Sequence, residues 1–267
     1  MAADSHRPRR RFGQHFLHDP GIVARSVAAI DPRPGDVLVE IGPGLGALTA
    51  PLLARVERLH AVELDRDLAA RLRAAHPPER LVVHAGDALR FDFGALPAPL
   101  RVVGNLPYNI STPLLFRLTG FAARVQDLHF MLQREVVDRM VAATSSPDYG
   151  RLSVMLQYRF ETTRLFVVGP GAFRPPPKVE SAVVRMVPRP AAALGARDPV
   201  LLARVVTAAF TKRRKTLRNA LAGVADEATL RALDIDPRLR PENLGVDDYV
   251  RIANALPSSP VQRERAG

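Results

Sequence analysis

The feature that most constrains the fold is an apolar run that ends in a cluster of glycines. Residues 37–41, Val-Leu-Val-Glu-Ile, have the nearly continuous apolar character of a strand buried on both faces of a parallel sheet. Gly42, Gly44 and Gly46 follow directly, before a helical segment from about residue 47 to 54. Glycines at this point allow a tight turn and a close approach of the backbone to a ligand. The stretch therefore predicts a strand–loop–helix unit with a ligand site at the carboxyl end of the strand.

The same alternation of strand-like runs and helical segments continues beyond this unit. Further strands are expected at residues 59–63, 81–84, 100–103 and 127–132, with a late pair at 165–168 and 182–187. The last part of the chain predicts helices at residues 199–210, 216–221, 227–233 and 246–256. Strands that alternate with helices are typical of an open, mostly parallel sheet. We therefore predict an α/β protein in which a Rossmann-like domain precedes a small all-helical C-terminal domain.

These signals divide the chain into four parts. We expect a basic N-terminal arm over residues 1–18, an α/β domain over 19–190, a helical domain over 191–256 and a tail over 257–267. The boundary near residue 190 falls in a stretch whose prolines and alanines suit a linker.

Composition excludes several classes of protein. The chain of 267 residues contains no cysteine, which removes disulfides and thiolate metal ligands and suits a reducing cytoplasm. No apolar run approaches the roughly 20 residues that a membrane helix needs. The first eleven residues are polar and basic, unlike a secretory signal. We therefore expect a cytoplasmic protein with no metal site and no membrane partner.

The net charge of +11 is concentrated in two stretches. Residues 1–18 carry four arginines against one aspartate, and residues 199–225 carry six cations and no acid. Clustering of this kind indicates a polyanion partner such as a nucleic acid. The alternative is a generally basic composition in which the clusters have no partner.

The loop after the fourth strand contains Gly104, Asn105, Leu106, Pro107 and Tyr108. An amide oxygen and a backbone carbonyl in this loop can accept the two N–H groups of an exocyclic amine, and the tyrosine ring can stack on a base. The alternative is an ordinary strand-to-helix loop in which asparagine and proline serve turn chemistry. Taken alone, the loop fits both interpretations.

Two acids follow neighbouring strands of the predicted sheet. Glu63 ends the second strand, 21 positions after Gly42, where a carboxylate accepts hydrogen bonds from ribose hydroxyls. Asp87, followed by Ala88, comes just after the third strand and can accept a hydrogen bond from an adenine amine, although aspartate is also common in turns. The glycine spacing does not say which adenosine-bearing cofactor binds, so a nicotinamide dehydrogenase is an alternative.

A proline-rich loop between the late strands contains Phe173 followed by Pro175, Pro176 and Pro177. Three consecutive prolines fix φ at each position and stiffen the loop, so we expect the Phe173 ring to be held over a pocket. The alternative is a rigid spacer with a packed phenylalanine.

In combination, these motifs resemble the ribosomal RNA adenine N6-dimethyltransferases, and among them the bacterial small-subunit enzymes. The likeness covers nearly the whole chain. It is carried by Phe12-Gly13-Gln14, Asn105-Leu106-Pro107-Tyr108, the pattern Phe173-x-Pro175-x-Pro177-x-Val179-x-Ser181 and the basic helical end. The resemblance implies a class I methyltransferase domain that uses S-adenosylmethionine. It also implies a monomer that dimethylates N6 of two adjacent adenosines near the 3′ end of 16S rRNA, in the pre-30S particle, during ribosome biogenesis.

The resemblance also implies roles for individual residues. The cofactor would be held by His15, Leu17, Gly42, Gly44, Gly46, Glu63, Asp87, Ala88 and Asn105, with His15 and Leu17 closing over its methionine part. The catalytic group would be Asn105, Leu106, Pro107, Tyr108 and Phe173, with the two rings on either side of the target base. RNA backbone would be contacted by Arg9, Arg10, Arg11, Lys212, Arg213, Arg214, Lys215 and Arg218. The chain departs from the commonest pattern at position 15, where His15 replaces an asparagine.

Two other functions share most of these motifs. One is methylation of 23S rRNA by an adenine methyltransferase of the macrolide-resistance type. The other is a ribosome-assembly factor with the same fold and little catalysis.

Overall fold

The computed structural model describes residues 14–257, and the chain divides into two compact units. The first unit comprises Met1–Val137, described from Gln14 on, and Thr162–Pro188. The second unit comprises Asp138–Glu161 and Arg189–Gly267, described up to Pro257. Residues 138–161, which the sequence analysis placed in the α/β domain, thus group with the helical end of the chain.

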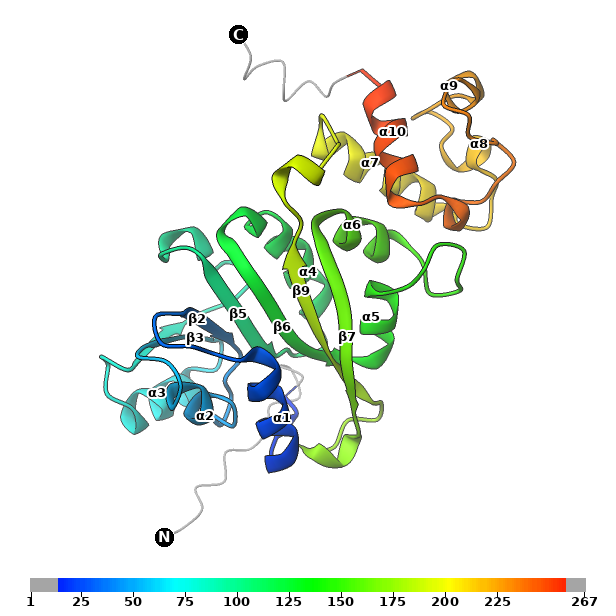
Figure 1. Ribbon diagram of the computed structural model, residues 1–267. Coiled ribbons are helices and arrows are strands. Elements are labelled where there is room, and N and C mark those ends of the chain that lie inside the picture. The colour runs from blue at the N-terminus through cyan, green and yellow to red at the C-terminus, as the bar shows by residue number, and fades with distance from the viewer. Residues whose placement is uncertain (1–13, 258–267) are drawn as a thin grey trace. The chain divides into compact units, whose positions relative to one another are not determined.

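The first unit is built on a seven-stranded sheet (Figure 1). Its order is β4-β3-β2-β5-β6-β9-β7, where β7 begins with the last two residues of the second unit. The strands are β2 (Val37–Ile41), β3 (Leu59–Glu63), β4 (Leu81–Ala85), β5 (Leu100–Asn105), β6 (Val125–Gln133), β7 (Phe160–Val168) and β9 (Ser181–Pro188).

The strand directions place a ligand site at one edge of this sheet. Neighbours from β4 to β6 are parallel, whereas β9 runs antiparallel to β6. The chain proceeds from β2 outward to β3 and β4, and then returns to place β5 on the other side of β2. In open α/β sheets, ligands bind outside the carboxyl ends of the strands at such a reversal of order. The predicted α/β sheet is confirmed, and its reversal lies between β2 and β5.

Helices connect the strands, and their starts follow local sequence signals. They are α1 (Pro20–Ile30), α2 (Thr49–Leu53), α3 (Arg66–Ala75), α4 (Ser111–Thr119) and α5 (Arg134–Met140), which ends inside the second unit. Asp19 caps α1 by accepting a hydrogen bond of 3.0 Å from the amide of Ile22, and Asp65 caps α3 in the same manner. These carboxylates satisfy amides that have no partner within the helix.

A short sheet of two strands lies apart from the main sheet. β1 (Phe16–Leu17) pairs antiparallel with β8 (Phe173–Arg174), so that Leu17 lies opposite Phe173. This pairing joins the segment before α1 to the proline-rich loop before β9. The sequence analysis did not predict it.

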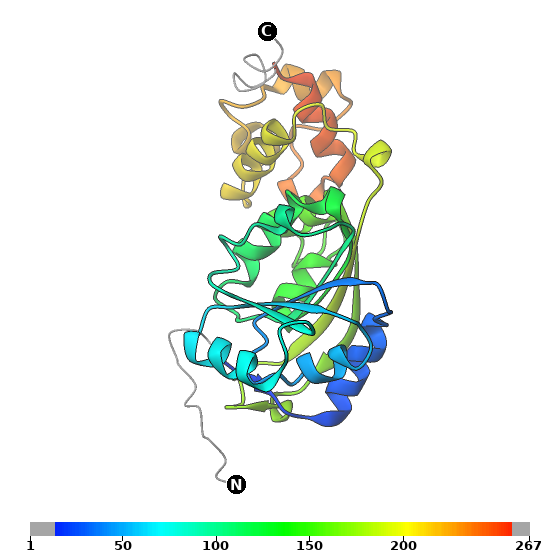
Figure 2. The ribbon, with the colours of Figure 1, turned by 90° about the vertical axis from the view of Figure 1, so that its left-hand side faces the viewer.

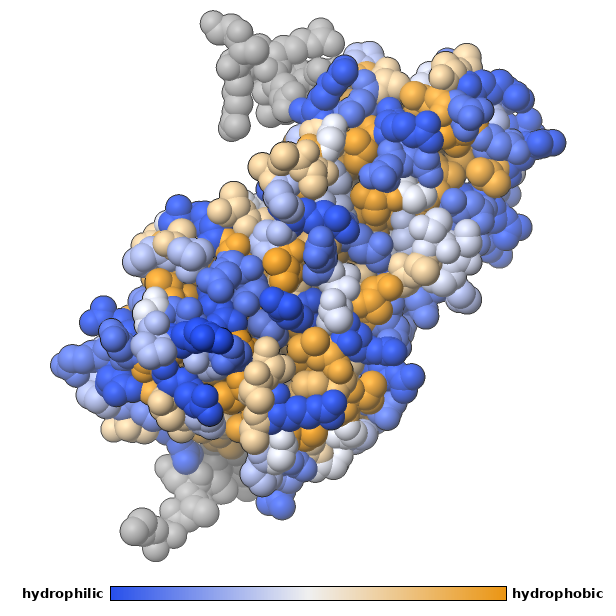
Figure 3. All heavy atoms as spheres, viewed as in Figure 1, coloured by the Kyte–Doolittle hydropathy of each residue, from blue (hydrophilic) through white to orange (hydrophobic). Residues whose placement is uncertain are grey.

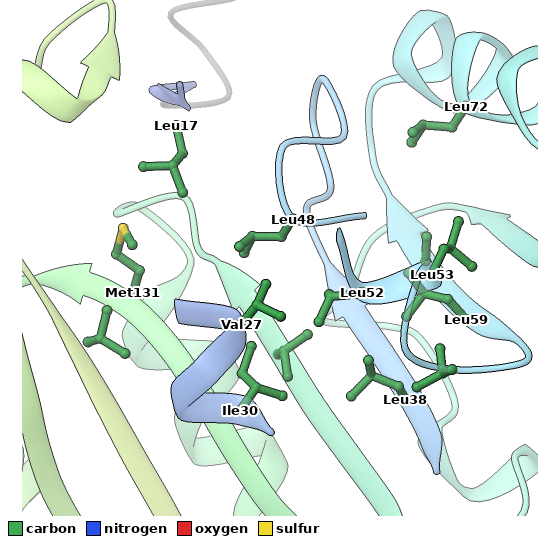
Figure 4. Close-up of a cluster of buried hydrophobic side chains, with 14 of the residues drawn as sticks. Leu17, Val27, Ile30, Leu38, Leu48, Leu52, Leu53, Leu59, Leu72 and Met131 are labelled. Carbon is green, nitrogen blue, oxygen red and sulfur yellow. The ribbon is translucent and has the colours of Figure 1, made fainter. Parts of the chain in front are cut away.

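The core of the first unit is a cluster of aliphatic side chains around α1, α2 and the first strands (Figure 4). It includes Val27 and Ile30 of α1, Leu38 of β2 and Leu52 of α2, all buried. The helix α2 that follows the glycine loop is therefore anchored by packing against α1 and β2.

The second unit is helical (Figure 2). Its helices are α6 (Arg151–Arg159), α7 (Pro199–Thr211), α8 (Leu217–Ala220), α9 (Glu227–Ala232) and α10 (Val246–Ala255). The helices predicted beyond residue 198 are confirmed. Its core contains Tyr149, Phe210 and Tyr249, whose rings lie in contact as neighbouring pairs.

Large apolar side chains are exposed at scattered positions among the described residues. Exposed large apolar side chains, such as Leu45, Val167 and Val200, come from separate elements, and hydrophilic residues lie between small apolar areas on the face shown in Figure 3. Scattered exposure of this kind is normal for protein surfaces. Within residues 14–257, no helix has the length and apolar character needed to span a bilayer.

Candidate active site at the switch point of the sheet

A cavity of about 290 Å³ lies at the carboxyl ends of β2, β3 and β5. It is formed by four loops that follow strands and by the segment before α1. Its lining includes residues 14–17, the glycine loop from residue 42, Glu63, Asp87, Ala88 and residues 105–110. One cavity in the first unit therefore brings together most of the predicted cofactor-binding and catalytic residues.

The glycine loop adopts a backbone that favours glycine. Gly42, Gly44 and Gly46 have φ of 66°, 58° and 86°, in the left-handed region. A Cβ atom on Gly44 would also lie 3.1 Å from the ring of Phe16, so the loop packs tightly against the segment before α1. The loop and this segment form one wall of the cavity.

Glu63 is held with its carboxylate at the cavity. It is 6% exposed, and its two oxygens accept hydrogen bonds from the amides of Gly44 at 3.1 Å and Asp65 at 2.9 Å. Burial raises the pKa of Glu63, and these backbone hydrogen bonds counteract the rise. Asp87 also lines the cavity and accepts a hydrogen bond of 2.8 Å from the amide of Leu89, a turn contact that engages one of its two oxygens.

Glu40 is a further acid of the cavity that the sequence analysis did not assign. It is 2% exposed and accepts a hydrogen bond of 2.7 Å from the hydroxyl of Thr49. Burial raises its pKa to about 7, the Thr49 hydrogen bond opposes this rise, and the nearby charge of Glu63 adds to it. The signal in the sequence was an acid inside an apolar strand, directly before the glycine loop.

The lining of the cavity carries acidic side chains without basic partners among the described residues. Glu40, Glu63 and Asp87 contribute three carboxyl groups, and the described residues of the lining include no lysine or arginine. Buried acids without a cationic partner are costly, and such arrangements are characteristic of functional sites. The cavity therefore suits a ligand that carries positive charge.

The side chain of Asn105 has a defined orientation at the end of β5. Its Nδ2 donates a hydrogen bond of 3.0 Å to the carbonyl oxygen of His15, which leaves Oδ1 as an acceptor. The amide of Leu106 donates to the carbonyl of Met131 at 3.1 Å, so the backbone is held against β6. Gly104 is required here, because a Cβ atom would lie 2.3 Å from the carbonyl oxygen of Ile41.

Tyr108 is fixed by its hydroxyl and by one face of its ring. The hydroxyl lies 2.7 Å from the hydroxyl of Ser181, which is buried at the start of β9. The ring stacks on the imidazole of His15, with centroids 5.5 Å apart and planes inclined by 30°. Burial raises the pKa of Tyr108, and the hydrogen bond to Ser181 opposes this rise. The sequence analysis listed Ser181 within a motif but did not assign it this contact.

Phe173 requires a correction. Its ring is 1% exposed, packs in the aliphatic core of the first unit and is absent from the lining of the cavity. The reason is its place in β8, where it pairs with Leu17 and adds to the core. The expectation of a ring held over the pocket is wrong for this structure, and the packed phenylalanine is what it shows.

The candidate RNA-binding residues divide into three groups. Arg9, Arg10 and Arg11 lie outside the described residues. Lys212, Arg214, Lys215 and Arg218 are exposed on the second unit. Of these, Arg218 lies 4.0 Å from the carboxylate of Glu227, whereas no ion pair within residues 14–257 involves the other three.

Arg213 differs from its neighbours. Its guanidinium donates to the carboxylate of Glu242 at 2.8 Å and to the carbonyl of Pro147 at 2.6 Å. This side chain therefore stabilises the second unit from within.

The fold and the site together define a Rossmann-like α/β protein with an acidic ligand cavity at the switch point of the sheet. The family model of ribosomal RNA adenine dimethylases matches residues 5–257, and the chain belongs to this family.

Relatives with curated names extend over almost the whole chain. "Ribosomal RNA small subunit methyltransferase A" of Chromobacterium violaceum is 61% identical over 252 residues, which cover 94% of this chain and 96% of that protein. The proteins of the same name from Aromatoleum aromaticum and Thiobacillus denitrificans are 65% and 63% identical, over 94% of this chain and 95% and 98% of theirs. The chain is thus a ribosomal RNA methyltransferase, which sets aside the dehydrogenase alternative.

Solved structures give the same fold. A dimethyladenosine transferase from Plasmodium falciparum has a TM-score of 0.78 at 24% identity and covers 89% of this chain and 96% of its own. The 23S rRNA methyltransferase ErmE has a TM-score of 0.69 at 26% identity and covers 90% of this chain and 99% of its own. The small-subunit relatives are therefore far more similar in sequence than the 23S rRNA enzyme.

Proposed function

We propose that this protein transfers methyl groups from S-adenosylmethionine to N6 of two adjacent adenosines near the 3′ end of 16S rRNA, in the immature small ribosomal subunit. The observation that carries the proposal is the shared cavity. The acids that suit a cationic cofactor and the Asn105 loop that suits an adenine amine face one space.

The residues of the cavity fit the cofactor. When bound, S-adenosylmethionine supplies an electrophilic methyl group on a sulfonium sulfur. Glu63 would accept hydrogen bonds from the ribose hydroxyls, and Asp87 one from the adenine amine, beside Ala88. Glu40 and Glu63 would favour the positive charge of the cofactor. His15 and Leu17 would cover its methionine part, beside the glycine loop.

The Asn105 loop would activate the acceptor nitrogen. The lone pair of an adenine amine is conjugated into the ring and is therefore a weak nucleophile. Asn105 Oδ1 and the carbonyl of Leu106 would accept the two N6 hydrogens, turn the lone pair toward the methyl group and stabilise the positive charge that develops. Pro107 shapes the turn, and the rest of the acceleration comes from positioning. The proton then leaves to water, so no general base is assigned.

Tyr108 would bind the flipped base by stacking. Such a contact is worth roughly 1–3 kcal/mol, which offsets the few kcal/mol needed to unstack an adenine. Ser181 holds the phenol hydroxyl at 2.7 Å and fixes the plane of the ring. Phe173 has no part in this arrangement, because its ring lies in the core.

Exposed cations of the second unit would hold the RNA backbone. Lys212, Arg214 and Lys215 have no ion pair within the described residues, and Arg218 is exposed beside them. Contacts of this type fix the position of an RNA but do not read its sequence. We expect the target to be chosen by the shape of the immature subunit, bound by one copy of the protein.

The test is methylation of defined substrates. The protein is incubated with labelled S-adenosylmethionine and immature small subunits that lack the modification, and in a parallel reaction with unmodified 23S rRNA. The RNA of each reaction is digested to nucleosides. We expect N6,N6-dimethyladenosine at two adjacent positions of 16S rRNA. Label in 23S rRNA would favour the macrolide-resistance type of activity. Tight binding of the subunit with no label would favour an assembly factor.

A further inference from the structure

The ring of His15 occupies one face of Tyr108. The two centroids lie 5.5 Å apart, and the planes are inclined by only 30°. His15 stands where most members of the family, by the resemblance noted above, have asparagine, whose side chain is no ring. An asparagine at this position could not make this ring contact.

The imidazole is held by one hydrogen bond besides this stacking contact. Its Nδ1 lies 2.8 Å from the carbonyl oxygen of Pro175. A carbonyl only accepts, so Nδ1 carries the hydrogen and the neutral ring is the Nδ1–H tautomer. The backbone of His15 is fixed separately, because its carbonyl accepts the hydrogen bond from Asn105. The side chain can therefore rotate away while the backbone stays in place.

The spacing leaves no room for a base between the two rings. Carbon atoms in contact lie about 3.5–4.0 Å apart, so a base inserted between parallel rings needs about 7 Å between their centroids. The observed 5.5 Å is too short. Tyr108 is also tethered through Ser181, so a base can stack on this face of the tyrosine only if the ring of His15 moves.

We infer that His15 is a positioning residue that occupies the place of the target adenine on Tyr108 in the free protein and yields this face when the base enters. The inference rests on the proposed function for the identity of the base. The flat imidazole shields the tyrosine face from water. An entering base must therefore gain more binding free energy than the His15 contacts that it replaces. An adenine gains this free energy from stacking on Tyr108 and from hydrogen bonding to Asn105. A base without an exocyclic amine lacks the hydrogen bond to Asn105.

The test measures base binding without methyl transfer. The full-length protein is saturated with S-adenosylhomocysteine, which fills the cofactor site and donates no methyl group, and is titrated with adenosine monophosphate by NMR. His15→Asn and His15→Ala should bind the nucleotide roughly threefold to tenfold more tightly than the parent, because no ring contact and no hydrogen bond to Pro175 need be broken. His18→Asn is the control, since His18 is exposed on the same segment, and it should match the parent.

The imidazole itself supplies a second readout. In the parent, the Nδ1–H resonance of His15 should shift as the nucleotide binds, since the bond to Pro175 breaks. Equal, weaker or unmeasurable binding in both His15 variants would overturn the inference, as would a His15 resonance that stays constant at saturation. A failure to methylate 16S rRNA would reject the proposed function. The role of His15 would still be decided by the nucleotide affinities, because their measurement involves no methyl transfer.

Discussion

Buried charges lie at both ends of the strands of the main sheet, which we call the carboxyl edge and the amino edge. The charges are arranged in opposite ways at these two edges. At the carboxyl edge, Glu40 and Glu63 line a cavity whose described lining holds no cation. At the amino edge, the buried guanidinium of Arg101 binds Asp36 at 2.6 Å, Asp127 at 2.8 Å and the carbonyl of Asp31 at 3.0 Å. Like charges meet at one edge and opposite charges at the other.

The difference separates a binding site from a structural support. The Arg101 cluster connects the end of α1 with the starts of β5 and β6, and its charges are satisfied without any ligand. A second cavity of about 400 Å³ lies beside it and includes both arginines and aspartates in its lining, among them Arg33, Arg185 and Asp31. The acids at the carboxyl edge gain a cationic partner only when a ligand binds. We therefore expect mutations at the amino edge to affect stability and mutations at the carboxyl edge to affect binding and catalysis.

The largest effect is expected from breaking the amino-edge cluster. Asp127→Ala removes the bidentate partner of a buried guanidinium and should lower the free energy of unfolding by about 3–5 kcal/mol. Urea denaturation measures this change. Glu57→Ala, at an exposed acid of the same unit, should change the free energy by less than about 0.5 kcal/mol. If Asp127→Ala is as stable as this control, the cluster does not support the fold.

At the carboxyl edge the expected loss is in rate. Asn105→Ala should lower single-turnover methyl transfer on the order of 100-fold or more, because one acceptor for the N6 hydrogens is lost where charge develops. Glu57→Ala, at an exposed residue outside the lining of the cavity, should react within a few-fold of the parent. A near-normal rate for Asn105→Ala, with the free energy of unfolding unchanged, would remove Asn105 from the mechanism.

A third prediction concerns the pH dependence of stability. The pKa of Glu40 in the folded protein is about 7, above its ordinary value of 4.5, so the folded state binds more protons in this interval. The resulting stabilisation is complete below pH 4.5 and is lost as the pH rises through 7. Glu40→Gln should remove this loss, so that between pH 5 and pH 8 the parent loses roughly 2–3 kcal/mol more than the variant. Identical pH profiles for the two proteins would contradict the assignment.

His129, in the middle of β6 beside Asp127 of the Arg101 cluster, should act in the opposite direction. Burial lowers its pKa from 6.5 to about 4, in spite of the opposing charge of Asp127. The unfolded state then binds more protons, and stability is lost as the pH falls from 6.5 toward 4. The contributions of Glu40 and His129 to the pH dependence of stability therefore partly cancel in the parent protein. Below pH 6.5, the slope of the free energy of unfolding against pH should become more positive in Glu40→Gln and less positive in His129→Gln. Urea denaturation at each pH measures this slope.

The parts of the molecule that were predictable from sequence are those with a local signal. The strand before Gly42 and the α7 start at Asp198 and Pro199 depend on residues close in the chain, and the structure confirms them. The Phe173 prediction was wrong because its position depends on a pairing with Leu17, more than 150 residues away. Two-residue strands carry no periodic pattern, so nothing local indicated this contact.

The site was predictable to a similar extent. Glu63, Asp87 and Asn105 lie at or just after the carboxyl ends of strands, and their common position was predictable because the carboxyl ends of parallel strands meet at one edge. Glu40 was missed because an acid inside an apolar strand gives no sign of which way its side chain faces. The contact between Tyr108 and Ser181 joins a loop to the start of β9, 73 positions away, and only the fold brings them together.

The smallest effect tests whether the same distinction between paired and unpaired charges holds on the second unit. Lys215→Gln removes an exposed cation, and each lost phosphate contact should make the slope of log affinity against log salt less steep by about 0.7–0.9. Arg213→Gln is the matched comparison, because Arg213 is already paired with Glu242, and its slope should change less. The measurement is RNA binding at several salt concentrations, at a temperature where both variants are folded. If Arg213→Gln changes the slope as much as Lys215→Gln, pairing within the unit does not decide which cations hold the RNA.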